Sequence, residues 1–192
     1  MRIIVGITGA SGVILGVNLL KVLAALPDCE THLVITEGAK RTLQYETDIH
    51  VEDVIALADY YHDNNDLAAP ISSGSFKTDG MIIIPCSMKT LAGVVTGYTD
   101  NLLLRAADVC LKERRQVVLV PRELPLSSIH LKNMAKAARH GCVILPPMLT
   151  FYNNPGSIQD MINHLIGKIL MMFNLSFREF VPWQGVKENG RK

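Results

Sequence analysis

Apolar residues in this chain gather in short runs that are separated by longer patterns of helical period. The runs rich in β-branched residues, which we interpret as buried strands, cover residues 2–8, 31–36, 81–84, 116–120 and 142–145. Helical patterns occupy residues 13–26, 37–45, 51–58, 91–97, 102–114 and 128–139, and a last one runs from 157 to about 173. Apolar strands that alternate with helices are typical of parallel sheets covered on both faces. The pattern therefore predicts an α/β fold, a three-layer sandwich with a mostly parallel sheet.

The longest irregular stretch spans residues 59–80. It is polar, contains Ser72-Ser73-Gly74-Ser75, and exceeds the usual length of a connection, so it is interpreted as a functional loop. No internal repeat, linker or low-complexity tract interrupts the pattern. We therefore expect residues 1–192 to form a single domain, with a C-terminal tail from about 174 to 192 that packs on a neighbouring subunit.

Composition narrows the classes of partner. Charged residues make up 19% of the chain, below the roughly 25% of an average soluble domain, and hydrophobic residues make up 48%, which favours a homo-oligomer. The net charge is +1 with no basic stripe, so nucleic acid is not an expected partner. No run approaches the roughly 18 apolar residues of a membrane span, and the N-terminus enters a strand directly, so neither a span nor a signal peptide is expected.

The four cysteines are scattered and form no CxxC pair. Their spacing favours neither a structural zinc site nor a disulfide framework. We expect a cytoplasmic protein with free thiols and no bound metal. The histidines show no metal-ligand spacing either, and His32 and His164 are interpreted as structural residues.

The segment after the strand at 81–84 offers the clearest candidate chemistry. Residues 85–90 read Pro-Cys-Ser-Met-Lys-Thr and place two hydroxyls, Ser87 and Thr90, and one cation, Lys89, at the start of a helix. The carboxyl edge of a parallel sheet is where such folds bind anions and cofactors. Ser87 could be a simple N-cap, but a lysine in the first helical turn is unfavourable without an anion. A ligand role is therefore favoured over the simple cap.

The first turn has glycines at positions 6, 9 and 12, which fits neither GxGxxG nor a P-loop. Thr36 ends the second strand where a dinucleotide-binding fold carries an acidic residue, so a nicotinamide dinucleotide is disfavoured. Ser11, flanked by this glycine-rich turn, could hold a phosphate or the edge of a flavin. A tight turn with no ligand explains the glycines equally well.

Other candidates follow later strands. Arg122 and Glu123 come directly after the strand at 116–120, so they are expected at the same sheet edge, where the arginine binds an oxyanion or merely pairs with its neighbour. Tyr152 alone would be a packed loop residue. Lys168 lies within an apolar helix pattern and either snorkels or meets an anion. Trp183 either anchors the tail to a partner or stacks on a ligand.

Several motifs in this order identify a family. The motifs are Gly6-x-Thr8-Gly9-Ala10-Ser11-Gly12, Ile71-Ser72-Ser73-Gly74-Ser75-Phe76, Pro85-Cys86-Ser87-Met88-Lys89-Thr90-Leu91, Arg105-Ala106-Ala107-Asp108-Val109, Leu111-Lys112-Glu113-Arg114-Arg115 and Val120-Pro121-Arg122-Glu123. Over essentially its whole length the chain resembles the UbiX-like flavin prenyltransferases, which include proteins described as small subunits of phenolic acid or hydroxybenzoate decarboxylases. The resemblance implies a Rossmann-like or flavodoxin-like fold, FMN, and transfer of a prenyl group from dimethylallyl phosphate to N5 and C6 of reduced FMN. It also implies a dodecamer and a UbiD-type decarboxylase that uses the product.

The resemblance assigns roles to residues by motif. FMN contacts are implied for Gly9, Ala10, Ser11, Thr36, Ser87, Met88, Lys89, Thr90 and Arg122. Contacts with the prenyl phosphate are implied for Lys112, Glu123, Tyr152, Lys168 and Trp183, and catalytic roles for Ser11, Glu46, Lys112 and Glu123. Two positions depart from the family pattern. Thr36 stands for a usual serine and keeps the hydroxyl, whereas Lys168 stands for a usual arginine and loses the bidentate fork.

Two other functions stay open at this stage. One is a flavin-dependent decarboxylase like the cysteine decarboxylases of related architecture, which use a PASANT-type loop and a catalytic histidine. The loop at 85–90 differs from that motif, and the first helix carries no histidine. The other is a non-catalytic FMN-binding subunit of a larger decarboxylase.

Overall fold

The computed structural model describes residues 1–183 and 185. The chain divides into two compact units, residues 1–147 and residues 148–192, and each is described by itself. The predicted tail at about 174–192 falls in the second unit, and its residues 184 and 186–192 lie outside the described part. No described helix combines the length and the apolar content needed to cross a membrane.

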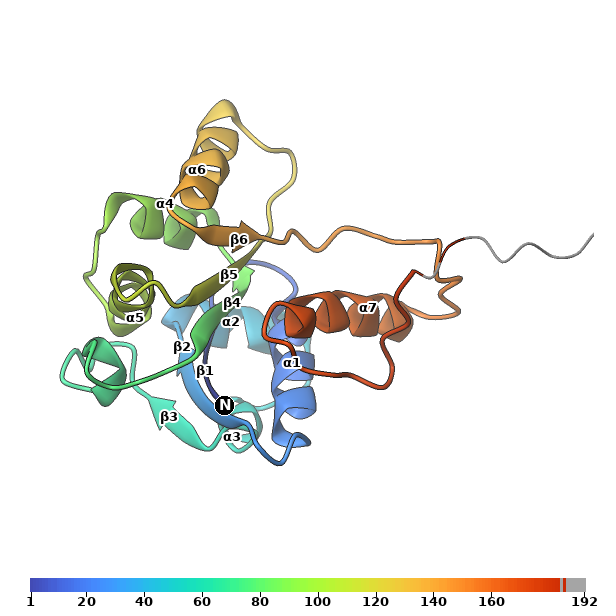
Figure 1. Ribbon diagram of the computed structural model, residues 1–192, viewed down its shortest axis with the longest axis horizontal. Coiled ribbons are helices and arrows are strands. Elements are labelled where there is room, and N and C mark those ends of the chain that lie inside the picture. Colours follow the sequence, from blue (N-terminus) through green and yellow to red (C-terminus); the bar gives the residue numbers. More distant parts are fainter. Residues whose placement is uncertain (184, 186–192) are drawn as a thin grey trace, which may run out of the picture. The chain divides into compact units, whose positions relative to one another are not determined.

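The first unit is built on a six-stranded sheet with the order β3-β2-β1-β4-β5-β6 (Figure 1). The strands are β1 (Arg2–Ile7), β2 (Glu30–Ile35), β3 (Tyr60–His62), β4 (Gly80–Cys86), β5 (Gln116–Pro121) and β6 (Cys142–Ile144). Every pairing is parallel. This is the strand order of the Rossmann-type doubly wound fold, in which the winding reverses between β1 and β4. The predicted fold class is therefore confirmed.

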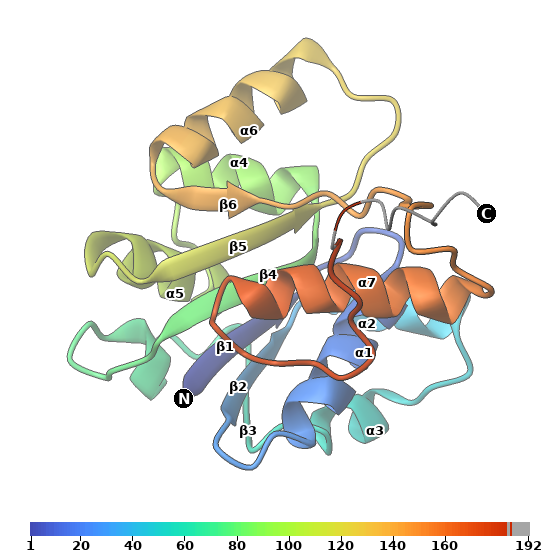
Figure 2. The same cartoon turned by 45° about the vertical axis from the view of Figure 1, so that its right-hand side comes forward.

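Helices cover the sheet on both faces (Figure 2). The helices of the first unit are α1 (Val13–Ala24), α2 (Glu37–Glu46), α3 (Val51–Ile55), α4 (Met88–Thr96), α5 (Leu102–Lys112) and α6 (Ser128–Arg139), with a 3₁₀ turn η1 (Pro70–Ser72). Helix α1 packs on β1, β2 and β4, whereas α5 packs on β4 and β5 from the other side. Right-handed crossovers from the central strand dictate this arrangement, because each half of the sheet receives its helices on one face.

Strand β4 forms the centre of the core. All seven of its residues are buried, as the uninterrupted apolar run predicts for a strand covered on both faces. Helix α1 approaches it closely at Gly16, where an added Cβ would lie 2.6 Å from the carbonyl oxygen of Ile84. That atom is backbone and cannot rotate away, so the helix–sheet distance requires glycine at this position.

Three differences from the sequence prediction concern the sheet and the helix that follows β4, whereas the other predicted boundaries move by at most three residues. Strand β4 continues through Pro85 to Cys86 instead of ending at Ile84, because the Pro85 carbonyl still accepts a hydrogen bond and the pairing with β5 shifts register between Ile83 and Cys86. Helix α4 begins at Met88, earlier than predicted, since Ser87 caps it. The stretch at 59–80 contains the short edge strand β3, whose residues are exposed or only partly buried and carry no apolar run.

The second unit contains helix α7 (Ile158–Met171). Ser157 caps it as predicted, accepting a hydrogen bond from the amide of Asp160 over 3.2 Å. The chain then turns back along the helix, so that Phe180 lies against Gly167, where an added Cβ would meet the phenyl ring at 2.2 Å. This close approach fixes the returning segment on α7.

The Gly16→Ala variant tests the approach of α1 to β4. We expect it to lower the free energy of unfolding by about 1–3 kcal/mol, because the methyl group overlaps the Ile84 carbonyl. Urea unfolding at fixed protein concentration measures the effect. Lys21→Ala, an exposed substitution in the same helix, is the control and should stay within about 0.5 kcal/mol. An equal or higher stability of Gly16→Ala would contradict the close packing.

Candidate functional site

One buried hydroxyl joins the carboxyl ends of β1 and β4. The Oγ1 of Thr8 donates to the carbonyl of Pro85 over 2.7 Å and accepts from the amide of Ser87 over 2.8 Å. The Thr8 amide also donates to the Pro85 carbonyl over 3.3 Å. The two loops that follow these strands are thereby held side by side at the point where the winding of the sheet reverses, which is where such sheets bind ligands.

The loop after β1 also lies against the start of α2. An added Cβ at Gly9 would come within 2.8 Å of the Gly38 backbone, so only glycine permits this contact. Thr36 donates its amide to the Ile7 carbonyl over 3.0 Å, and its Oγ1 accepts from the Ala39 amide over 3.2 Å as the N-cap of α2. Its hydroxyl proton has no acceptor among residues 1–183 and 185, so it is available to a ligand. Gly9 and Thr36 therefore lie close together at this edge of the sheet.

The loop after β4 presents two linked hydroxyls. The Ser87 Oγ accepts from the Thr90 amide over 3.2 Å and donates to the Thr90 Oγ1 over 3.0 Å. Ser87 is thus the N-cap that the simpler interpretation expected, and the cap leaves Thr90 Oγ1 a hydrogen to donate. Lys89 is exposed in the same turn and has no ion pair among the described residues. A cation at a helix N-terminus without a partner fits an anionic ligand.

The thiol of Cys86 in this loop is not accessible to a ligand. Cys86 is buried in the core, and burial raises its pKa well above the usual range. Burial likewise raises the pKa of Cys110 and Cys142 to about 11. These three thiols stay protonated at neutral pH, so they are poor nucleophiles.

Strand β5 brings Arg122 and Glu123 to the same edge. The Arg122 amide donates to the Cys86 carbonyl over 3.1 Å, which fixes the end of β5 beside the end of β4. Both side chains are exposed, and the ion pair between neighbours that the sequence left open does not form. The Glu123 carboxylate instead accepts from the Leu124 amide over 3.1 Å. The Arg122 guanidinium is therefore free of charged partners within the described residues.

The side chain of Glu46, the last residue of α2, binds the N-terminus of α1. Its Oε2 accepts from the amides of Gly12 and Val13 over 2.8 and 3.3 Å. Gly12 adopts φ +93°, a left-handed conformation that glycine allows, and so directs its amide at the carboxylate. Ser11 is the residue just before. The predicted proton-transfer residue Glu46 therefore lies beside the predicted FMN loop.

Lys112 lies at the opposite edge of the sheet. It is the last residue of α5, and the chain enters β5 at its amino end only a few residues later. It pairs with Glu113, whose pKa is lowered chiefly by that hydrogen bond. An added Cβ at Gly74 would lie 2.8 Å from the Lys112 ammonium, which places it beside the loop before β4. Within one chain, Lys112 is not brought together with Ser11, Ser87 or Arg122.

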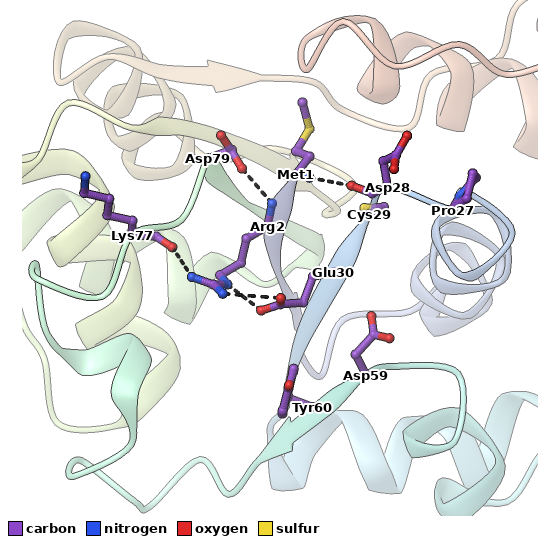
Figure 3. Close-up of a pocket in the computed structure, with 10 residues that line it drawn as sticks. All are labelled: Met1, Arg2, Pro27, Asp28, Cys29, Glu30, Asp59, Tyr60, Lys77 and Asp79. Carbon is purple, nitrogen blue, oxygen red and sulfur yellow. Dashed lines mark hydrogen bonds and ion pairs between the residues drawn. The ribbon is translucent and has the colours of Figure 1, made fainter.

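A cavity of about 710 Å³ opens at this amino edge (Figure 3). Its polar groups largely bind one another: Arg2 pairs with Glu30, the Arg2 guanidinium donates to the Lys77 carbonyl, and the Arg2 amide donates to Asp79. None of the residues predicted for FMN or the prenyl phosphate lines it. The cavity is therefore not assigned to the candidate site.

His32 behaves as the structural residue that was predicted. It is buried, with Nδ1 at 2.9 Å from His62 Nε2 and Nε2 at 2.8 Å from a Glu30 oxygen. Its ring stacks on both Tyr60 and His62. The hydrogen bond from Arg2, followed by that of His32, lowers the pKa of Glu30 to about 2. Both ring nitrogens of His32 are satisfied.

The second unit gathers three of the residues predicted to meet the prenyl donor. The Tyr152 hydroxyl lies 2.9 Å from His164 Nε2, and the Tyr152 ring packs edge-on against Trp183 at 5.6 Å. Lys168 is exposed one helical turn after His164. Burial, and then the charge of Lys168, lower the pKa of His164. The sequence did not reveal the pairing of His164 with Tyr152, because a loop and a helix contribute one residue each.

Comparison with known proteins agrees with these features. The Flavoprotein family model matches residues 1–171. A Sedimentibacter hydroxybenzoicus relative named as a UbiX-like flavin prenyltransferase is 63% identical over 189 residues, covering 98% of this chain and 100% of the relative. The flavin prenyltransferase UbiX of Escherichia coli K12 is 54% identical over 186 residues, covering 96% of this chain and 98% of the relative.

Solved structures show the same fold. A dodecameric FMN-dependent UbiX-like decarboxylase from Escherichia coli O157:H7 has a TM-score of 0.94 at 54% identity, covering 96% of this chain and 100% of that one. AnUbiX (PadA1), solved with FMN and dimethylallyl pyrophosphate, has a TM-score of 0.94 at 53% identity. The match covers 97% of this chain and 98% of that one. Identity of this extent over nearly whole chains shows that the protein belongs to the UbiX-like flavin prenyltransferases, within the Flavoprotein family.

Proposed function

We propose that this enzyme transfers the dimethylallyl group of dimethylallyl phosphate to N5 and C6 of reduced FMN and so makes prenylated FMN. The observation that carries the proposal is the convergence of three loops at the reversal point of the sheet, where Thr8 ties β1 to β4 and the Arg122 amide ties β5 to β4. These ties place hydroxyls and an unpaired guanidinium at one edge. Such donors suit a ligand that carries a phosphate and a polar ring.

The donor set fits FMN. We assign the FMN contacts to Gly9, Ala10, Ser11, Thr36, Ser87, Met88, Lys89, Thr90 and Arg122. Lys89 and Arg122 have no ion pair within the described residues, so their charges are available to anionic oxygens. Because Gly9 has no side chain, the loop after β1 packs directly against the backbone of Gly38. We propose that this packing allows a flat ring to approach the backbone of the loop. When bound and reduced, FMN supplies the nucleophilic nitrogen and carbon of the reaction.

The protein contributes charge stabilisation and proton transfer. The bond between the allylic carbon and the phosphate oxygen breaks as the carbon–nitrogen bond forms, so negative charge collects on the phosphate. We propose that Lys168, Tyr152 and Arg122 stabilise that charge, with Lys112. Bond formation at N5 releases one proton, and ring closure at C6 releases another while the prenyl double bond takes one up. Glu46 and Glu123 are the proposed groups that accept and return these protons, and Ser11 relays near N5. Trp183 shields the prenyl group with an apolar ring face.

For Lys112 to act in this way, it must come from another copy of the chain. Its place at the amino edge of the sheet, beside Gly74 and Glu113, separates it from Ser11 and Arg122 of its own chain. We therefore propose a homo-oligomer, a dodecamer like the solved relative, in which Lys112 completes the site of a neighbour. The tail from about 174 to 192 is the proposed second contribution to this assembly.

We propose a UbiD-type decarboxylase as the recipient of the product, and the cytoplasm as the place of transfer. The rival functions are a decarboxylase, the activity in the name of the solved relative from Escherichia coli O157:H7, and an FMN-binding accessory subunit. No observation on the described residues favours either rival over the family to which the chain belongs.

Anaerobic incubation with reduced FMN and dimethylallyl phosphate tests the activity itself. We expect mass spectrometry of the extracted flavin to show FMN heavier by one C5 prenyl unit. The control omits the prenyl donor, and a parallel sample receives dimethylallyl pyrophosphate. Unmodified FMN from folded, flavin-loaded protein with both donors would refute the transferase and favour the accessory subunit.

Removing the guanidinium from the carboxyl edge should stop the reaction. We expect Arg122→Ala to lower product formation by about a hundredfold or more, because a preorganised cation is lost where charge develops. Product formation by Arg122→Lys should lie between that of the wild type and that of Arg122→Ala, since lysine keeps the positive charge but cannot form two parallel hydrogen bonds. Arg139→Ala, an exposed arginine at the end of α6, is the matched control. Turnover of Arg122→Ala equal to that of the control would exclude the assigned role.

Mixed oligomers test whether Lys112 acts from a neighbouring copy. Lys112→Ala and Arg122→Ala chains should each be inactive alone. When they are co-expressed and assemble at random, about a quarter of the sites receive both intact residues, and activity returns to that level. A mixture that stays as inactive as the separate variants would show that both residues must belong to one chain.

A further inference from the structure

His164 in α7 combines burial with an incomplete set of hydrogen bonds. The residue is almost fully enclosed, at 4% exposure. Its Nε2 lies 2.9 Å from the Tyr152 hydroxyl, whereas its Nδ1 is buried and has no partner among the described residues. His32, the other buried histidine, satisfies both nitrogens. A buried polar atom without a partner calls for a physical explanation.

The imidazole is held in place by aromatic rings. Tyr152 meets it edge-on at 5.3 Å, and Phe180 packs against it at 5.2 Å. Phe180 reaches this position because Gly167, one turn along the helix, has no side chain to exclude it. The orientation of the ring, and hence the direction of Nε2, is fixed by packing within this unit.

Burial, and then the positive charge of Lys168, lower the pKa of the ring, which favours its neutral form. A neutral imidazole carries one N–H, so one nitrogen donates and the other accepts. A hydrogen on Nδ1 would bury a donor without an acceptor. A hydrogen on Nε2 leaves only a lone pair unpaired, and unpaired acceptors are the more common case in proteins. The geometry therefore favours the Nε2–H form.

We propose that His164 is a positioning residue that donates its Nε2–H to the Tyr152 oxygen and leaves the phenol hydrogen free for a phosphate oxygen of the prenyl donor. The inference rests on the proposed function, in which Tyr152 meets that phosphate. If the hydrogen bond ran the other way, the Tyr152 phenol would donate its only hydrogen to the imidazole. Its oxygen would then face an anion with lone pairs alone, which is repulsive.

The surroundings of Tyr152 agree with this role. Tyr152 is 47% exposed although its hydroxyl is bound to a buried group, so the residue is accessible to a ligand. Trp183 packs edge-on against the ring, and exposed Lys168 supplies a positive charge one helical turn from His164. A hydrogen bond received at the phenol oxygen also strengthens the one its O–H donates.

Nitrogen-15 NMR of the full-length protein, labelled at histidine and loaded with FMN, tests the tautomer. The His164 signals are identified by their loss in His164→Gln. We expect a protonated Nε2 and a bare Nδ1 at neutral pH. A proton on Nδ1, or on both nitrogens, would overturn the proposal, whether or not the protein transfers a prenyl group.

A double-mutant cycle tests the consequence for the reaction. We expect His164→Phe, which keeps a ring but no N–H, to raise KM for dimethylallyl phosphate roughly three- to tenfold, the worth of one hydrogen bond. In the Tyr152→Phe background the same change should have no further effect, because His164 acts through the phenol. His164→Gln should restore part of the loss by its amide N–H. His140→Gln, an exposed histidine of the first unit, is the control.

The outcomes separate this inference from the function on which it rests. An effect of His164→Phe that persists without the Tyr152 hydroxyl would mean that the ring is merely structural, and would overturn the inference. If His164→Phe does not fold, His164→Gln and the NMR measurement decide. Failure of the wild-type enzyme to prenylate FMN would refute the proposed function instead, and the NMR measurement would still decide the polarity of the pair.

Discussion

The hydrogen bonds of Thr8 are the constraint on which the candidate site depends. A parallel sheet leaves the loops after neighbouring strands free to diverge, and at the reversal point the two connecting helices leave on opposite faces. The Thr8 hydroxyl offsets that divergence by bonding to the carbonyl of Pro85 and the amide of Ser87 at once. Because it is buried, water does not compete for either partner. The relative position of the two ligand loops is thus set inside the core.

The sequence predicted the class of fold because burial on two faces leaves a strong pattern. Strand β4 is apolar throughout, and Ser128–Arg139 and the Ser157 cap were located correctly from helical period and capping chemistry. Strand β3 was missed because none of its three residues is fully buried, so it leaves no apolar pattern in the sequence. The continuation of β4 through Pro85 was missed because it depends on a carbonyl partner, Thr8, that is distant along the chain.

The site was predictable to the extent that it follows from the edge of the sheet. Residues that directly follow β1, β2, β4 and β5 must lie at one edge, and Ser11, Thr36, Ser87 and Arg122 do. Lys112 shows the limit, since a motif gives the identity of a residue but not the copy of the chain in which it works. His164 shows another, because its significance lies in an unpaired nitrogen that depends on three-dimensional burial.

The carboxylate of Glu46 at the start of α1 has a consequence for how a nucleotide is oriented. An isolated helix N-terminus attracts phosphate, but here its first amides already bind a negative charge. A second anion at that point would be repelled, whereas an uncharged ring edge would not. The electrostatic polarity of the edge thus runs from the Glu46 carboxylate at the start of α1 to the cationic side chains after β4 and β5. A ligand with one charged end and one neutral end can lie along that gradient in a single direction.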